Sequence, residues 1–297
     1  MKTLIIGSTV CDVVIEVERL PKIGEDENIK QQSLHIGGCA FNVSRMLALF
    51  QSEYVLFTPV GQGVYGDFVR HYLQQENIPI LLEPSQPNGC CYCIVDQSGE
   101  RTFICEHGAE YFFKEAWFNQ INSLDFQYVY ICGLEIEETS GDQIILFLEK
   151  NPHLTIFFAP GPRICKIGRE KMKRLLALHP ILHLNKSEIL AFSQKESLEK
   201  AVEEMYLLSQ NTIIVTLGAE GTYYKDHTDC YFIPTKQVKP VDTIGAGDGH
   251  IGAIIACLSR SMPLKQAIQI ANKVSGKIVQ KKGAALTQEE FEELHII

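Results

Sequence analysis

Short apolar runs alternate with longer segments of helical period along most of this chain. Continuous apolar runs predict buried strands over residues 3–7, 54–60, 128–132, 154–159, 181–184 and 212–217. Apolar positions spaced three and four apart predict helices over residues 40–50, 68–76, 142–150, 198–209, 251–259 and 264–281. Because a helix between two strands acts as a crossover, this order predicts an α/β fold with a central, mostly parallel sheet flanked by helices.

Two segments break this rhythm. Residues 13–35 and 88–107 have more strand-like alternation, as in the run from Cys91 to Val95, and we expect them to pair into a small separate sheet. The sequence contains no internal repeat and no change of composition that would mark a linker. We therefore expect a single domain over residues 1–297 with the small sheet as an excursion within it.

Composition and charge narrow the class of protein. The chain has 297 residues, of which 45% are hydrophobic and 21% charged, as in ordinary globular proteins. A formal net charge of -9 argues against a nucleic-acid partner, whose phosphates require clustered Lys and Arg. No stretch approaches the roughly 18 apolar residues of a membrane span, so we expect a cytoplasmic protein without a membrane partner. The ten cysteines are scattered, which predicts reduced thiols and no disulfide framework.

The motif richest in chemistry is DTIGAGD, from Asp242 to Asp248, which is followed by an apolar helical pattern. Small residues beside a helix N-terminus let backbone N–H groups approach an anion, and the helix end adds partial positive charge. Phosphoryl transfer also needs an acceptor for a hydroxyl proton, and Asp248 is placed to be that acceptor. The alternative is that Asp248 only caps the helix and that the glycines only form a tight turn.

Four motifs in order resemble those of the ribokinase family of sugar and nucleoside kinases, also called the PfkB family. They are Gly37-Gly38-Cys39-Ala40-Phe41-Asn42, Asn185-Lys186-Ser187-Glu188, Thr216-Leu217-Gly218-Ala219-Glu220-Gly221 and the complete D-T-x-G-A-G-D motif that ends at Asp248. The resemblance implies a three-layer ribokinase-like fold whose small β lid is formed by residues 13–35 and 88–107. It also implies ATP-dependent phosphorylation of a hydroxyl of a sugar or sugar-like molecule.

The same resemblance implies roles for individual residues. Asp248 would be the general base, and the backbone of Gly245, Ala246 and Gly247 would form the anion hole. The residues that would hold substrate hydroxyls are Asp12, Gly37, Gly38, Asn42 and Glu135. The residues that would lie near the nucleotide are Asn185, Thr216, Gly218, Gly221 and Asn272, the last beside adenine.

Metal ions and assembly are also implied by the resemblance. Asn185 and Glu188 would help to place Mg²⁺ through its waters, in keeping with the reluctance of magnesium to shed them. A monovalent cation such as K⁺ would lie near Asp242, Ile244 and Gly283, and a homodimer would form through the lid. An alternative stays open, because Asn185 and Glu188 are also spaced as an N-cap and the third residue of a helix.

The sequence departs from the family pattern at several positions. Val10 stands where ribokinase has Asn, and Cys39 stands where it has Lys after the double glycine. These changes weaken the case for ribose and disfavour a sugar phosphate. A nucleoside kinase of the same family, including the pseudouridine type, is an alternative. Gly249 and His250 replace the small hydroxyl and aromatic residues that are more usual after the base, and their role is open. The double glycine could also be merely a turn, and Asp12 merely a solvated strand residue.

Two other functional classes remain. The run from Gly61 to Gly66 fits G-x-G-x-x-G, and Glu83 lies at a suitable distance for a ribose contact, as in an NAD-dependent oxidoreductase. A non-catalytic, ligand-binding regulator on a kinase scaffold is the other class, because a fold does not determine a function. The intact Asp248 and its glycines argue against lost catalysis.

Overall fold

The computed structural model describes residues 1–296, which divide into two compact units. The first unit is built from Met1–Gly7, Cys39–Leu56 and Phe113–Ile297, and the second from Ser8–Gly38 and Phe57–Phe112. No helix among the described residues is both long enough and apolar enough to cross a membrane.

The first unit contains an eight-stranded sheet within the described part of the chain. In sheet order its strands are β12 (Cys230–Pro234), β11 (Gly221–Lys225), β10 (Ile213–Thr216), β9 (Ile181–Asn185), β8 (Thr155–Ala159), β7 (Tyr128–Cys132), β1 (Thr3–Ile6) and β4 (Tyr54–Phe57). Strands β1, β7, β8, β9 and β10 pair in parallel, whereas β10, β11 and β12 pair antiparallel. The central parallel strands are almost wholly apolar because helices cover both of their faces.

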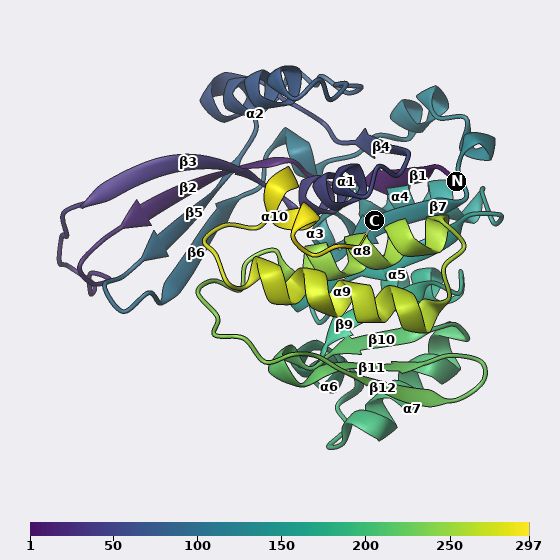
Figure 1. Cartoon of the computed structure of the whole chain (residues 1–297). Helices are drawn as coiled ribbons and strands as arrows, with labels where there is room; N and C mark the ends of the chain where they lie inside the picture. Colours follow the sequence, from purple (N-terminus) through teal and green to yellow (C-terminus); the bar gives the residue numbers. More distant parts are fainter. Residues whose placement is uncertain (297) are drawn as a thin grey trace. The chain divides into compact units, whose positions relative to one another are not determined.

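The helices form the outer layers of this unit. Helix α8 (Ala246–Ser259) packs on both α1 (Cys39–Leu49) and α9 (Leu264–Ile278) on one face of the sheet, in front in Figure 1. The other α-helices of the unit are α3 (Gly133–Glu137), α4 (Gly141–Glu149), α5 (Arg169–Leu176), α6 (Lys186–Ser193), α7 (Leu198–Ser209) and α10 (Gln288–Glu292). Single 3₁₀ turns are η2 (Glu115–Gln120), η3 (Ser123–Asp125), η4 (Gly161–Arg163) and η5 (Gly218–Glu220).

Helix α8 begins five residues earlier than its apolar pattern indicates, at Ala246 and not at Ile251. Its first turns are rich in glycine, which disfavours a helix by local propensity. Close packing explains why the helix forms nevertheless. A Cβ atom on Gly249 would lie 2.2 Å from Ile278 of α9, and one on Gly252 would lie 2.8 Å from Met46 of α1. The glycines therefore let three helices approach closely, and Asp248 becomes the third residue of α8.

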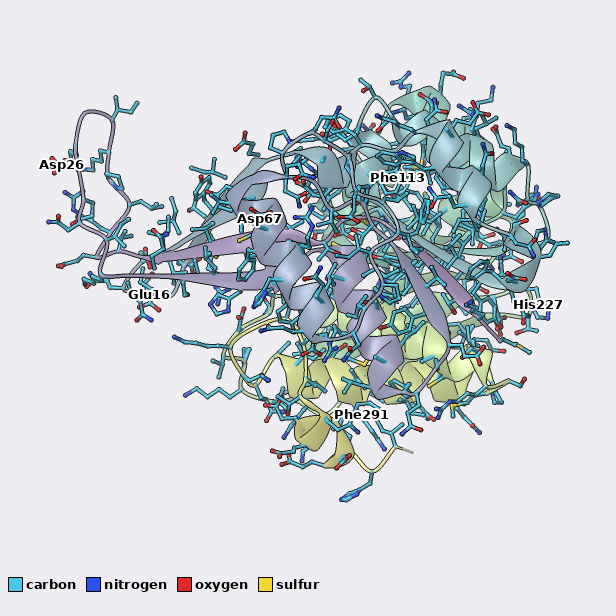
Figure 2. All side chains as sticks on the ribbon, turned by 90° about the horizontal axis from the view of Figure 1, so that it is seen from above. Glu16, Asp26, Asp67, Phe113, His227 and Phe291 are labelled. Atoms are coloured by element: carbon cyan, nitrogen blue, oxygen red, sulfur yellow. The ribbon has the colours of Figure 1, made fainter. Side chains whose placement is uncertain are left out.

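The second unit is built on a four-stranded sheet in the order β3 (Gln31–Gly37), β2 (Val10–Glu16), β5 (Cys90–Val95) and β6 (Arg101–Glu106). These strands overlap the two segments expected to form a small sheet, but β2 begins at Val10, before residue 13, and β3 ends at Gly37, after residue 35. Helix α2 (Gly63–Gln75) packs on β2, and η1 (Ala109–Tyr111) follows β6. The loop between β2 and β3 projects beyond the strand ends and has Asp26 near its tip (Figure 2).

Candidate active site

The turn before α8 is shaped by glycine. Gly245 is the N-cap residue, with φ of +72° in the left-handed region that glycine tolerates. A Cβ atom at Gly245 would lie 2.4 Å from the carbonyl oxygen of Ala284, so the packing also requires glycine. By contrast, a Cβ at Gly247 would meet nothing within 4 Å. The N-terminus of α8 is thus tightly supported beneath Gly245 and open at Gly247, as an anion-binding turn requires.

The carboxylate of Asp248 is held by the first turn of α1. Its Oδ2 atom accepts a hydrogen bond of 2.8 Å from Nδ2 of Asn42. Burial raises the pKa of Asp248 to about 6, against hydrogen bonds from Asn42 and Cys39 that favour the charged form. A carboxylate with this pKa is largely ionised at neutral pH and can still take up a proton. Since Gly245 and not Asp248 occupies the N-cap position, the simple capping alternative does not account for Asp248.

A second acidic side chain lies close to Asp248 in the same unit. Glu135, in α3 just beyond β7, is only 1% exposed, and its Oε2 atom accepts a hydrogen bond of 2.7 Å from Sγ of Cys132. Its negative charge contributes to the raised pKa of Asp248. The structure therefore brings together Asn42, Glu135 and Asp248, which are far apart in the sequence. Cys39, noted in the sequence only as a departure, also contacts Asp248, and no local signal indicated this.

An open pocket of about 440 Å³ lies beside the end of β9. Its lining residues are Asn185, Lys186, Ser187, Leu190, Thr216, Leu217 and Gly218. The predicted nucleotide residues Asn185, Thr216 and Gly218 are thus on one pocket wall. Gly221 has φ of +130°, and a Cβ there would lie 2.2 Å from the carbonyl oxygen of Ile233, so its evident role is close packing of β11 on β12.

Asn185 and Glu188 form a capping box at the start of α6. The Oδ1 atom of Asn185 accepts a hydrogen bond of 2.9 Å from the Glu188 N–H, and Oε2 of Glu188 accepts one of 2.9 Å from the Asn185 N–H. The capping interaction expected as the alternative is therefore formed. It is compatible with a role in binding Mg²⁺, because carboxylate oxygens have further lone pairs and oxygen ligands suit Mg²⁺. Within residues 1–296 no group of three or more His, Cys, Asp or Glu is arranged to hold a metal ion.

Asn272 lies in a buried polar network rather than on an open surface. Its Oδ1 atom accepts hydrogen bonds from Thr222 Oγ1 at 2.7 Å and from His250 Nε2 at 3.0 Å, while its Nδ2 donates to the carbonyl oxygen of Ile233 at 3.1 Å. These bonds occupy the side chain, so a contact with adenine stays a prediction.

The same network determines the tautomers of two histidines. Because Oδ1 of Asn272 can only accept, His250 carries its proton on Nε2, and its Nδ1 accepts from Nε2 of His183 at 2.9 Å. Burial lowers the pKa of His250 to about 4, and burial followed by the charge of His250 lowers the pKa of His183. The pair is therefore neutral and structural at physiological pH, and it ties α8 to β9 two residues from Asp248 and from Asn185.

The carboxylate of Asp242 joins two segments of backbone. Its Oδ1 atom accepts from the Ile244 N–H and its Oδ2 atom from the Gly283 N–H, each at 3.0 Å. The three residues expected near a monovalent cation are thus neighbours. The cation itself stays a prediction.

In the second unit, the predicted substrate residue Asp12 lies in the middle of β2. A Cβ atom on Gly37 would lie 2.1 Å from Oδ2 of Asp12, so this glycine makes space for the carboxylate. Gly38 has φ of +100°, and a Cβ there would lie 2.5 Å from the carbonyl oxygen of Ser8. Burial, and then the charge of Cys105, raise the pKa of Asp12 to about 7. Such a shift indicates more than a solvated strand residue.

The glycines of the G-x-G-x-x-G run have packing roles. A Cβ atom on Gly66 would lie 2.3 Å from the carbonyl oxygen of Gly61. That oxygen also accepts a hydrogen bond of 2.9 Å from Nη2 of Arg70, whose Nε lies 3.3 Å from Oε2 of Glu83. Glu83 is thus engaged by Arg70, and these contacts account for the motif without a dinucleotide.

Comparisons with known proteins agree with this geometry. A sequence model of the pfkB family carbohydrate kinases matches residues 2–290. The chain is 30% identical to the uncharacterized sugar kinase YegV of Escherichia coli strain K12, over 97% of this chain and 92% of the relative. It is 26% identical to the ribokinase of Staphylococcus aureus strain COL, over 99% of this chain and 98% of the relative.

Among solved structures, ribokinase from Thermotoga maritima superposes with a TM-score of 0.85 at 22% identity, over 99% of both chains. This likeness confirms the predicted three-layer ribokinase-like fold. The dinucleotide alternative finds no support in these matches. Family match, relatives and fold together show that the chain belongs to the pfkB family of carbohydrate kinases and is an ATP-dependent sugar kinase.

Proposed function

We propose that this kinase transfers the γ-phosphoryl group of ATP to a hydroxyl of a sugar or sugar-like small molecule, with Asp248 as the general base. The observation that carries the proposal is the placement of Asp248 in the first turn of α8, directly after the glycine turn at Gly245. A proton acceptor and an anion-binding helix end thus occur within four residues. Phosphoryl transfer requires both groups.

The residues of the first unit divide this work between them. The hydrogen bond from Asn42 orients Oδ2 of Asp248, so the carboxylate is held in one position while it takes the hydroxyl proton. The N–H groups at Gly245, Ala246 and Gly247 lie at the positive end of the helix, where they would stabilise the charge that develops on the moving phosphoryl group. The Ala246 N–H also donates a long hydrogen bond of 3.3 Å to the carbonyl oxygen of Thr243. The space at Gly247 lets that group approach the backbone.

The nucleotide and its metal are assigned to the end of β9. ATP lies in the pocket lined by Asn185, Thr216 and Gly218. Glu188 and Asn185 would hold Mg²⁺ through its waters, and the ion would supply positive charge that offsets that of the phosphates. The proposal also includes a K⁺ ion near Asp242. The carboxylate of Asp242 accepts hydrogen bonds from the backbone of Ile244 and Gly283 and thereby orders the loop that leads into α8.

Acceptor hydroxyls are assigned to carboxylate and amide side chains, in each unit separately. Glu135 and Asn42 in the first unit and Asp12 in the second offer acceptors for the O–H groups of a polyol. The four-stranded sheet as a lid, a homodimer through it, and a cytoplasmic location stay predictions.

The test is the Asp248→Asn variant. Asparagine keeps the size of the side chain but cannot take the proton, so we expect turnover to fall by about 10²–10⁴. ATP and acceptor affinity should change only a few-fold because the backbone of Gly245 to Gly247 is intact. Isothermal titration with each ligand and single-turnover phosphoryl transfer separate binding from chemistry, and Asp26→Asn near the tip of the β2–β3 loop is the matched control (Figure 2).

The acceptor is identified first with the parent enzyme, by ADP release against a panel of free sugars, sugar acids and nucleosides. A folded Asp248→Asn variant that transfers phosphate at the parent rate would show that Asp248 is not the base. ATP binding without transfer to any member of the panel would favour the non-catalytic regulator.

A further inference from the structure

Two thiols face each other across β5 and β6 in the second unit. Cys91 and Cys105 are directly opposed in the antiparallel register, and their Sγ atoms are 3.3 Å apart. Opposed residues in antiparallel strands have Cα atoms about 4.5 or 5.5 Å apart, depending on the type of pair. Both values lie within the range of about 4.4–6.8 Å that disulfides span. The backbone therefore already permits a bond between the two sulfur atoms.

The two thiols differ in access to solvent. Cys105 is exposed on the outer strand of the sheet, and Cys91 is partly exposed. Another neighbouring pair, Cys39 and Cys132, contrasts with them, because Cys132 is only 3% exposed. A reagent in solution can thus reach Cys105 far more readily than Cys132.

The two thiols and Asp12 lie side by side in the four-stranded sheet. Cys91 is the register partner of Asp12 in the parallel pairing of β2 with β5, so Asp12, Cys91 and Cys105 form one row across three strands. At this proximity the charge of Cys105 adds to burial in raising the pKa of Asp12. A change in the charge or position of the sulfur atoms therefore alters the surroundings of the Asp12 carboxylate.

We propose that Cys91 and Cys105 are a reversible disulfide site, and that its oxidation by a low-molecular-weight disulfide weakens acceptor binding through Asp12. The thiolate of Cys105 attacks one sulfur of the small disulfide and expels a thiolate. Cys91 then loses its proton to solvent, attacks Sγ of Cys105 and expels the second thiolate. The two cysteines lose two electrons and two protons, and the small disulfide is reduced to two thiols.

The order of attack follows from the environment of each sulfur. The hydrogen bond with Cys105 and burial raise the pKa of Cys91, which keeps it as a thiol while it stands beside Cys105. Cys105 is the exposed partner and makes the first attack; Cys91 completes the bond. Exposed disulfides are generally the labile and regulatory ones, so the bond should be reducible again.

The consequence for the acceptor rests on the proposed function of Asp12. Closing the sulfur atoms from 3.3 Å to a bond of about 2.05 Å moves Cys91 relative to its register partner. A hydrogen bond from substrate to the Asp12 carboxylate should weaken, since such bonds depend on geometry.

The experiment incubates the full-length enzyme with glutathione disulfide and maps tryptic peptides without reduction. Trypsin cleaves after Arg101, between the two cysteines, so the disulfide would link peptide 71–101 to peptide 102–114. We expect this cross-linked pair in the oxidised enzyme and its loss after treatment with dithiothreitol. The KM for the acceptor should rise about tenfold, as expected when one hydrogen bond to a charged group is weakened. The KM for ATP should stay the same.

Serine variants make the assignment specific. Cys91→Ser and Cys105→Ser should abolish both the cross-link and the change in acceptor KM, whereas Cys93→Ser on the same strand and Cys165→Ser in the first unit should retain both. The proposal would be overturned if oxidation stopped at a single glutathione adduct on Cys105, or if the cross-link went through Cys93. It would also be overturned by a Cys91–Cys105 disulfide that left the acceptor KM unchanged. The cross-link is detected by mass and assigned by the serine variants, because peptide 71–101 also contains Cys90 and Cys93. Absence of phosphoryl transfer in the reduced enzyme would refute the proposed function and would leave the test of the disulfide unaffected.

Discussion

Two half-buried carboxyl groups, one in each unit, show how different surroundings give related groups different properties. Asp248 lies in the first turn of a helix, and Asp12 lies in the middle of a strand. Burial is the largest cause of the raised pKa at both positions. At Asp248 the amide of Asn42 donates a hydrogen bond that favours the charged form, and the pKa is about 6. At Asp12 the charge of Cys105 acts in the opposite direction, and the pKa is about 7.

The difference suggests a division of roles. A group that must be ionised to take a proton benefits from a donor that holds its pKa below neutral pH. A group that only binds hydroxyls does not have to take up a proton, so a higher pKa is tolerated, although its charged form accepts the stronger hydrogen bond. We therefore expect changes at Asp248 to alter turnover and changes at Asp12 to alter acceptor binding.

The largest effect in this comparison, after Asp248→Asn, is expected for Asp12→Asn. Loss of a charged acceptor typically weakens a hydrogen bond by about 1.5–3 kcal/mol, so kcat/KM for the acceptor should fall by about 10–100-fold. The loss should appear mainly in KM, as measured by steady-state kinetics at saturating ATP. A fall in kcat as large as that of Asp248→Asn would contradict the division of roles.

The next largest effect is a loss of stability in His250→Phe, close to Asp248, without a change in acceptor binding. His250→Phe leaves Nε2 of His183 and Oδ1 of Asn272 without one hydrogen-bond partner, which should lower the free energy of unfolding by roughly 1–3 kcal/mol near pH 7.5. Urea denaturation measures this change. Acceptor KM of the folded variant should remain close to that of the parent, because no Asp12 contact is altered.

The stability difference between the parent and His250→Phe should depend on pH. The pKa of His250 is about 4 in the folded chain and 6.5 when unperturbed, so between these values the unfolded state binds more protons. Stability from neutral His250 is therefore complete above about pH 6.5 and is lost as the pH falls toward 4. The advantage of the parent over His250→Phe should shrink over this window. The raised pKa values of Asp12 and Asp248 make contributions of opposite sign to the stability, but both proteins share them, so they cancel in the difference between parent and variant. A difference in unfolding free energy that stays constant with pH would show that His250 is not held neutral.

A smaller effect is expected for Asn42→Ala, which makes Asp248 more like Asp12. Without the amide donor the pKa of Asp248 should rise. The ionised base is then available only at higher pH, so the acidic limb of the kcat profile should move upward by about one pH unit, equivalent to about 1.4 kcal/mol. Asp12→Asn serves as the control and should leave that limb in place. An unchanged limb in Asn42→Ala would separate the hydrogen bond from catalysis.

The smallest effect is expected at the capping box of α6. Glu188→Gln retains an acceptor for the Asn185 N–H, so stability should be nearly unchanged, while loss of charge should raise the Mg²⁺ concentration for half-maximal rate about threefold. Glu290→Gln is a matched control, since Thr287 and Glu290 form the same box at α10. A shift in melting temperature with an unchanged Mg²⁺ response would support a role in capping alone.

Elements whose local signals agreed were predictable from the sequence. The strand over 128–132 and the helix over 198–209 have the predicted ends, because a continuous apolar run and a regular helical period were each sufficient. The hairpin of β11 and β12 was missed. Its polar and aromatic residues have no strong alternation, and pairing with β10 stabilises it. The start of α8 was also wrong, since contacts with α1 and α9 override the poor helix propensity of its glycines.

The sequence by itself determined the α/β class, the motif order and the kinase family, because these depend on local periodicity and on runs of neighbouring residues. Only the tertiary structure decided which groups meet. It brought Asn42 and Cys39 to Asp248, His183 to His250, and Cys105 to Cys91. The physical reason is that pKa values and hydrogen-bond partners depend on burial and on atoms distant in the chain, which sheet register and helix packing bring together.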